Sequence, residues 1–291
     1  MAITDTGSAT GLLANILQEA MFTASERSIA GGLVTVYDMT ATPGLVAQVP
    51  VYPEISADDL TDGGDLSTID SIDPASVTIT AAEIGVRADI TDLLAESSAQ
   101  NLAQDVGTMI GNSIGEKLDT NVFAQFDSIT QVINTAGATA GAITVNDVLN
   151  AVYTLRGQNA PTDADGDYNL VVAPSVAFSL ASALAGAGFQ SGGATALSQT
   201  GNDMIANSAY MGRIFNVKVF MSTGVSADSA SDSIGCLFSP QAFGHVIKRP
   251  LTIREQRDES LRLTEYVGTT AVGNGILKNT YAVRIKATPQ I

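Results

Sequence analysis

Residues 111–115, GNSIG, have the spacing that would suit catalysis, because they match the G-x-S-x-G pattern of a nucleophile elbow. In that motif the serine occupies a strained turn between a strand and a helix, and a histidine takes its proton. Here Ser113 lies within the most regular helical pattern of the chain, and the only histidine, His245, is far away in the sequence. A serine hydrolase using Ser113 therefore remains only an alternative, and the sequence predicts no enzyme.

A second pattern that could do chemistry is DADGD at 163–167, whose closely spaced carboxylates could bind a metal ion. A calcium loop of the EF-hand type needs glycine at its sixth position and glutamate at its twelfth. Counted from Asp163, those positions hold Tyr168 and Pro174. The pattern favours an Asp-Gly turn. The chain also has no Walker A motif and no Cys/His cluster, so we expect no cofactor and no metal site.

The charge of the chain is strongly negative and unevenly distributed. It carries 14 basic and 30 acidic residues, a formal net charge of −16. Residues 1–212 hold only 4 of the basic residues, and residues 213–291 hold 10. A protein that binds DNA tightly does so by replacing the counterions of phosphates with its own cations. This composition predicts a protein that either encloses nucleic acid without binding it tightly or does not contact nucleic acid.

Five of the basic residues gather at 247–266, IKRPLTIREQRDESLRLTEY, with four acids interleaved. Alternating apolar positions on both sides of 257–260 predict two strands joined by a charged turn. A nucleic-acid stripe would be mostly basic, whereas mixed signs suit contacts between identical copies. We expect inter-subunit ion pairs at five residues: Arg254, Arg257, Asp258, Glu259 and Arg262. The alternative is a solvated tip whose charges contribute little.

A long helix is predicted over 98–127, where apolar residues recur at helical spacing. Gly107, Gly111 and Gly115 form a ladder along one side of it. Glycine in a helix costs about 1 kcal/mol relative to alanine. Three on one stripe therefore predict close packing against another backbone.

The segment before that helix reads as an arm followed by a long hairpin. Residues 11–27 carry an apolar helical stripe, which would dock either on the core or on a neighbouring subunit. Residues 45–53 and 77–90 alternate like strands, with a change of phase near Ala82 that predicts a bulge. The acidic segment 54–74 would form the hairpin tip. Because an isolated hairpin is only marginally stable, this one needs a surface to lie on.

The rest of the chain mixes helices and strands. Helices are predicted at 145–157 and 175–186, and strands at 168–174, 213–222, 235–239 and 276–287. The fold class is therefore α+β. Hydrophobic residues make up 45% of the chain, which is enough for a sizeable core, and the single cysteine, Cys236, excludes an intrachain disulfide. No apolar run approaches the length of a membrane span.

The order of these elements resembles that of the major capsid protein of tailed bacteriophages, whose fold is shared with encapsulins. The resemblance covers nearly the whole chain. It is carried by IGEKLD (114–119), LVVAPSVAFSLASAL (170–184), YMGRIFNVKVFMSTGV (210–225) and GILKNTYAVRIKA (275–287) in that order.

The resemblance implies an N-terminal arm at 1–44 and an extended E-loop at 45–90. A peripheral domain would combine a spine helix within 91–130 with the long strands of 240–291, and an axial domain would span 131–239. It implies that acids of the E-loop contact other subunits: Glu54, Asp58, Asp59, Asp62 and Asp65. Family members form pentamers and hexamers of an icosahedral shell around DNA. The expected location is the virion capsid, assembled in the bacterial cytoplasm without a membrane.

Two departures from the family refine this expectation. Some members cross-link subunits through a lysine in the E-loop, but the first lysine of this chain is Lys117. We therefore expect non-covalent overlap between subunits, or a separate cement protein. Only about 44 residues precede the E-loop, so we also expect a separate scaffolding protein, besides a portal. An encapsulin-type cargo compartment remains the alternative within the same fold.

Overall fold

The structure is a computed structural model that describes seven stretches of the chain and four single positions between them. The stretches are 16–24, 28–52, 75–93, 102–134, 141–186, 210–228 and 231–288, and the single positions are 55, 57, 59 and 62. In this part of the chain no helix is both long and apolar enough to cross a membrane.

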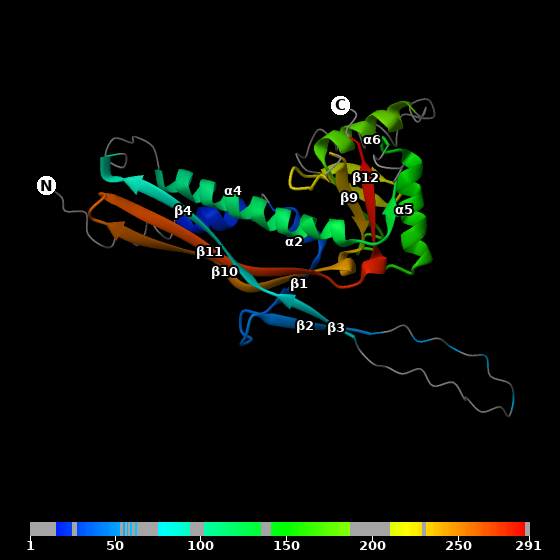
Figure 1. The fold of residues 1–291 in the computed structure, drawn as a ribbon, viewed down its shortest axis with the longest axis horizontal. Coiled ribbons are helices and arrows are strands. Elements are labelled where there is room, and N and C mark those ends of the chain that lie inside the picture. Colours follow the sequence, from blue (N-terminus) through cyan, green and yellow to red (C-terminus); the bar gives the residue numbers. More distant parts are fainter. Residues whose placement is uncertain are drawn as a thin grey trace.

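The elongated part of the molecule is a four-stranded sheet with a helix lying along it (Figure 1). In spatial order its strands are β1 (Thr35–Asp38), β10 (Phe243–Asp258), β11 (Leu263–Ile276) and β4 (Ala82–Thr91). β1 runs parallel to β10, and the other neighbours are antiparallel. At about 3.3 Å per residue, the 16 residues of β10 span roughly 50 Å.

The helix along this sheet is α4 (Leu102–Phe123), which buries one face against the strands. Val106, Ile110 and Ile114 of α4 share a core with Ile253 and Tyr266 of the sheet. The helix ends earlier than the predicted 98–127, because residues Ala124–Ser128 tighten into a 3-10 helix, while residues 98–101 lie outside the described residues. Helical residues 16–24 and the short α2 (Ala30–Leu33) lie beside α4.

The compact part is built on a six-stranded sheet. Its spatial order is β5 (Val132–Ile133), β12 (Ala282–Ala287), β9 (Ser233–Phe238), β6 (Tyr168–Val172), β8 (Val217–Met221) and β7 (Tyr210–Ile214). Two helices, α5 (Val145–Gly157) and α6 (Pro174–Gly186), contribute buried side chains to the core of this sheet. α5 occupies the predicted residues because Thr144 and Asp147 form a reciprocal capping box at its start.

An aromatic cluster joins the two parts. Phe123 and Phe126, at the end of α4, pack with Phe238 of β9 and Phe243 of β10. Ring centroids lie 5.1–5.7 Å apart in the four contacting pairs. Tilted and edge-on aromatic pairs at this spacing add stabilisation beyond the area that they bury. The end of α4 is therefore fixed relative to both sheets.

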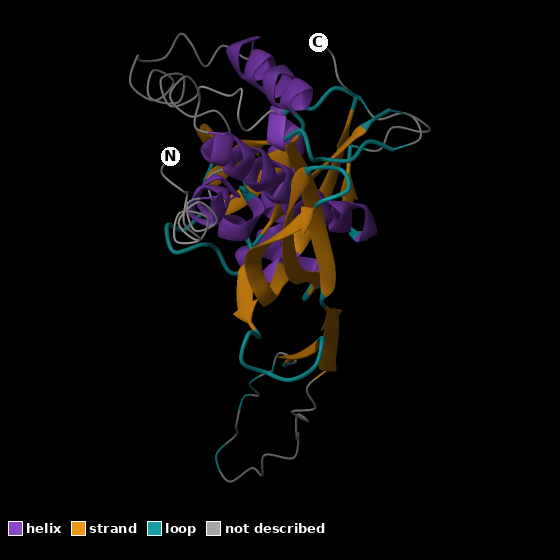
Figure 2. Cartoon of the chain, turned by 90° about the vertical axis from the view of Figure 1, so that its left-hand side faces the viewer, coloured by secondary structure: helices purple, strands orange, loops and turns teal. Residues whose placement is uncertain are grey.

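A two-stranded hairpin projects from the body, as the turned view in Figure 2 shows. It consists of β2 (Val46–Val51) and β3 (Ala75–Thr80), paired with each other and with no other described strand. The predicted bulge near Ala82 is wrong: the phase changes there because the chain leaves this hairpin and enters the four-stranded sheet as β4. Within the predicted arm over 45–90, β2 and β3 form the hairpin, whereas β4 belongs to the sheet of the body.

Two strands predicted from the sequence are wrong. The segment 276–287 is not one strand, because Ile276 ends β11, Asn279–Tyr281 form a 3-10 helix, and only Ala282–Ala287 form β12.

The segment 213–222 is also not a single strand, because β7 and β8 form a hairpin across a turn at Phe215 and Asn216. Both turn residues have positive φ, 50° and 62°. Turns of this kind usually carry glycine, and neither residue here is glycine, so the segment resembles an uninterrupted strand in sequence.

Candidate assembly surfaces

The predicted charged turn joins β10 and β11, two residues later than expected. β10 continues through Asp258, and the chain reverses over 259–262. The Asp258 carboxylate accepts hydrogen bonds from Ser260 Oγ at 2.7 Å and from the N–H groups of Ser260 and Leu261 at 2.9 and 3.1 Å. These donors hold the pKa of Asp258 below its ordinary value. Asp258 therefore shapes the turn of its own chain.

Arg257 also has partners within its own chain. Its guanidinium forms a two-pronged pair with the carboxylate of Asp92, at 2.5 and 2.7 Å, and contacts Glu259 at 3.3 Å. The hydrogen bonds from Arg257 hold the pKa of Asp92 below its ordinary value. This pair could not be predicted from the sequence, because Asp92 follows β4 and lies 165 positions away from Arg257.

The two other tip cations present their charge outward. Arg254 and Arg262 are exposed, and no ion pair involves either one in the described part of the chain. Arg262 lies close enough to Asp92 to favour its charged form. These arginines are the tip cations available to a partner.

A second charged surface covers the face of the sheet opposite α4. Val86, Ala88 and Ile90 of β4 pack toward α4, so the alternating Arg87 and Asp89 point the other way. Arg87 contacts Asp89 at 2.7 Å and Glu265 of β11 at 2.9 Å. Farther along the same sheet, Arg249 of β10 pairs with Glu83 of β4. Both signs are therefore interleaved and mutually paired on this face.

The glycine ladder of α4 lies where helical residues 16–24 cross it. A Cβ atom on Gly107 would lie 2.8 Å from the carbonyl oxygen of Ile16, and one on Gly111 would lie 2.6 Å from that of Ala20. Gly115 is also buried. At Gly107 and Gly111 the backbones approach so closely that no side chain fits.

A buried carboxylate missed by the sequence analysis fixes the next segment. Asp119 of α4 accepts hydrogen bonds from Ser28 Oγ at 2.7 Å and from the N–H groups of Ile29 and Ala30 at 3.1 and 3.0 Å. Only 5% of Asp119 is exposed. The contacts at Gly107 and Gly111 hold residues 16–24 on α4, and Asp119 holds residues 28–33.

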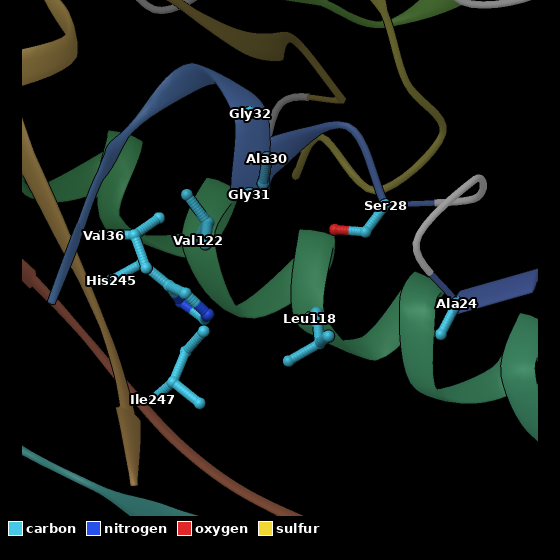
Figure 3. A pocket seen from close by; sticks show the side chains of 10 residues that line it. All are labelled: Ala24, Ser28, Ala30, Gly31, Gly32, Val36, Leu118, Val122, His245 and Ile247. Carbon is cyan, nitrogen blue, oxygen red and sulfur yellow. The ribbon is translucent and has the colours of Figure 1, made fainter. Parts of the chain in front are cut away.

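A cavity of about 280 Å³ lies beside the segment that Asp119 holds, and it is lined by residues of 28–32, α4 and β10 (Figure 3). His245 lines it and hydrogen-bonds through Nδ1 to Asn274 Oδ1 at 2.6 Å. Ser113 does not line this cavity. Ser113 is solvent-exposed and lies in the middle of α4, not on a turn that follows a strand. The elbow geometry of a hydrolase is therefore absent at Ser113.

The remaining acids fall into two groups. Glu54, Asp58 and Asp65 lie outside the described residues, whereas Asp59 and Asp62 are described and exposed. In the loop at 163–167, Lys218 contacts Asp163 at 3.0 Å and Asp165 at 2.5 Å. The ammonium group of Lys218 therefore offsets part of the negative charge of that loop.

Capsids and a virus-like particle are among the solved structures with this fold. The capsid of Ralstonia phage GP4 matches with a TM-score of 0.70 and 10% identity, over 89% of this chain and 88% of that one. The capsid of cyanophage P-SCSP1u matches with a TM-score of 0.66 and 20% identity, over 90% and 89%. A virus-like particle from Pyrococcus furiosus matches with a TM-score of 0.61 and 9% identity, over 94% and 98%.

None of the curated proteins matches the chain in sequence. The family model described as phage capsid protein matches residues 74–284, which include α4, the charged tip and most strands of both sheets. The expectation of a tailed-phage capsid fold is confirmed, and the chain belongs to the phage capsid protein family.

Proposed function

We propose that this capsid protein assembles into pentamers and hexamers that tile an icosahedral shell around phage DNA. The observation that carries the proposal is the β2–β3 hairpin, which projects from the body (Figure 2). Its outer face carries no charge, although the chain has 44 charged residues: Val46, Gln48 and Pro50 alternate with the buried Ala47 and Val49. An isolated two-stranded hairpin is marginally stable in water, so a neighbouring subunit completes it.

The charged tip provides the second contact between subunits. Arg254 and Arg262 are its outward cations, and they pair with acids of a neighbouring copy. Asp258, Arg257 and Glu259 hold the turn and present the remaining mixed charge. The E-loop acids Glu54, Asp58, Asp59, Asp62 and Asp65 contact a neighbour along the same hairpin. Identical copies that supply both signs form self-complementary contacts.

The shell protein has no catalytic role in this proposal. Its net charge of −16 leaves the neutralisation of packaged DNA to small cations. Scaffolding, portal and cement functions reside in separate proteins, and the shell assembles in the cytoplasm of the bacterial host. The similarity to the Pyrococcus particle extends to the fold alone and does not favour a cargo compartment.

Electron microscopy of the full chain, expressed with and without its neighbouring phage genes, tests the proposal. We expect pentameric and hexameric capsomers in closed shells, with one portal vertex when the portal is present. Small closed shells filled with a host enzyme would instead indicate a cargo compartment. A protein that stays monomeric at high concentration and with its phage partners would contradict the proposal.

A further inference from the structure

The projecting hairpin meets the body at one crossing point, where β3 lies over the β10–β11 pair (Figure 1). Three glycines line this point, and we call them the glycine seat: Gly244 of β10 and Gly273 and Gly275 of β11. Gly244 and Gly275 are direct cross-strand partners. Gly273 faces Val246, two residues farther along the same ladder. The three glycines therefore form one contiguous patch without side chains.

Each position of the seat is filled by β3. A Cβ atom on Gly273 would lie 2.7 Å from the carbonyl oxygen of Thr80 and 3.1 Å from the Cα atom of Ala81. A Cβ atom on Gly275 would lie 2.8 Å from Cγ1 of Ile79, and one on Gly244 would lie 3.0 Å from Cδ1 of Ile79. Cβ atoms do not tolerate contacts below 3 Å, so at Gly273 and Gly275 the close approach needs glycine.

The side chain of Ile79 occupies the seat and anchors the hairpin. Only 1% of Ile79 is exposed, and it packs with Ala47 and Val49 of β2 and Val246 of β10. This small core is separate from the three larger ones. It therefore ties the base of the hairpin to the body without involving the main core.

The seat lies immediately before the joint between the hairpin and the body. β3 ends at Thr80 and β4 begins at Ala82, so Ala81 is the only residue between the two sheets. The N–H of Ala81 donates to the carbonyl oxygen of Leu45 at 2.8 Å, which closes the hairpin at its base. Because both strands are fixed within a few residues of the joint, a small tilt here becomes a large displacement at the distal end.

We propose that the glycine seat sets the angle at which the β2–β3 hairpin leaves the body. Ile79 is the positioning residue, and the backbone contact between Gly273 and Thr80 is the stop that limits the tilt. The consequence for the size or closure of a shell rests on the proposed function, whereas the seating itself is a property of the single chain.

The neighbouring Gly85 provides a matched control. It lies on β4 in the same sheet, and a Cβ atom there would meet its nearest neighbour, Thr269 Cγ2, at an ordinary 3.5 Å. Gly273→Ala and Gly85→Ala make the same chemical change in adjacent strands. They differ in whether the added methyl group meets the hairpin.

Hydrogen exchange on the full-length protein measures the seating. In Gly273→Ala we expect amides of β2 and β3 to exchange about tenfold faster, while amides of β6 and β9 keep their wild-type rates. Ile79→Ala should give the same local increase without any backbone clash, so it tests the seat even if Gly273→Ala fails to fold. Gly85→Ala should leave the exchange of the hairpin unchanged.

Wild-type exchange of the hairpin in both Gly273→Ala and Ile79→Ala would overturn the proposal. Electron microscopy of the same variants separates the seating of the hairpin from its effect on the shell. Altered or open particles together with faster hairpin exchange would support the seat and its role in the shell. If the wild-type chain formed no particles while the exchange difference persisted, the proposed function would fail and the seat would stand.

Discussion

At the scale of single residues, the pair formed by Arg257 and Asp92 has a defined dependence on pH. The folded-state pKa of Asp92 lies below its ordinary value because Arg257 hydrogen-bonds to the charged carboxylate. A lowered pKa means that the pair stabilises the fold at pH values above the ordinary pKa of about 4. Its contribution is lost as the pH falls through the lowered folded value.

Comparing wild type with Asp92→Asn checks this prediction. Thermal unfolding at several pH values should show the wild type as the more stable protein at pH 6, with the difference shrinking below about pH 4. Because both partners are exposed, the difference should also shrink at high salt. A gap between the two proteins that stays constant from pH 6 to pH 2.5 would contradict the assignment.

Gly111 provides a second test at this scale, because two effects of alanine oppose each other there. Alanine is the better helix former by about 1 kcal/mol. The added methyl would lie 2.6 Å from the carbonyl oxygen of Ala20, and overpacking of this kind costs about 1–3 kcal/mol. The obstructing atom belongs to the backbone and cannot rotate away, so the clash outweighs the propensity.

We therefore expect Gly111→Ala to lower the free energy of unfolding and to loosen residues 16–24. Chemical denaturation measures the first effect, and limited proteolysis measures the second. Gly157→Ala at the end of α5 is the control, because a Cβ atom there would meet nothing within 4 Å. It should be neutral or slightly stabilising, and the same result for Gly111→Ala would refute the close crossing.

At the scale of elements, Asp119 is the contact on which the placement of residues 28–33 depends. Replacement by alanine leaves Ser28 Oγ and the N–H groups of Ile29 and Ala30 without their acceptor. A buried group left without its partner costs about 1–3 kcal/mol, so the loss for Asp119→Ala should be on the order of 2–4 kcal/mol.

Hydrogen exchange localises this effect. In Asp119→Ala the amides of Ile29 and Ala30 should lose protection, whereas those of α5 should not change. Glu116→Ala is the matched control, because Glu116 lies one turn away on the same helix with its side chain exposed. Equal effects of the two substitutions would mean that Asp119 does not anchor the segment.

The elements themselves were predictable where local signals agree. The residues of α5 follow from its apolar spacing together with the pair Thr144 and Asp147, which fixes its start. The charged hairpin also follows from alternation, because an exposed strand pair needs no distant partner to define its pattern. The turn lies two residues later than predicted. Its position depends on the Asp258 carboxylate, and nothing in the sequence distinguishes Asp258 from other surface acids.

What the sequence did not predict depends on contacts between distant segments. The link between Arg257 and Asp92 arises only because β11 brings β4 next to β10. The glycine seat likewise unites Gly244 and Gly275, which are unremarkable strand glycines until β3 lies over them. The turn at Phe215 was missed for a local reason, since its backbone conformation favours a glycine that the chain lacks.

At the scale of the whole molecule, the negative charge defines how the protein should behave toward DNA. Cations are concentrated after residue 212, and many of them are paired within the chain, as Arg213, Lys218 and Arg284 are. Binding through phosphates would release counterions and weaken steeply with salt. We expect purified subunits to show no measurable retention of duplex DNA in a gel-shift assay at 50 mM salt. Tight, salt-sensitive binding would contradict the proposed passive enclosure.

Assembly tests the outward cations of the tip. Charge reversal at Arg257 would place a carboxylate against Asp92 of the same chain and confound folding with assembly. Arg254 avoids this problem, because no ion pair within the described part of the chain involves it, whereas Arg262 forms no ion pair there but lies close enough to Asp92 to favour its charged form. Arg254→Glu should therefore keep the wild-type melting temperature, the double variant Arg254→Glu and Arg262→Glu should stay folded with a slightly lower one, and the double variant should lose the ability to form shells.

Neutral substitutions separate charge pairing from packing. With Arg254→Gln and Arg262→Gln, the side chains keep much of their bulk but lose the cation, so assembly should slow rather than stop. Ion pairs between copies are screened at high ionic strength, so wild-type assembly should slow as salt rises, whereas the glutamine variant should respond less. Light scattering follows both reactions. Normal shells from the double glutamate variant would show that the tip is a solvated turn, and the contact between capsomers would then have to lie on the β2–β3 hairpin alone.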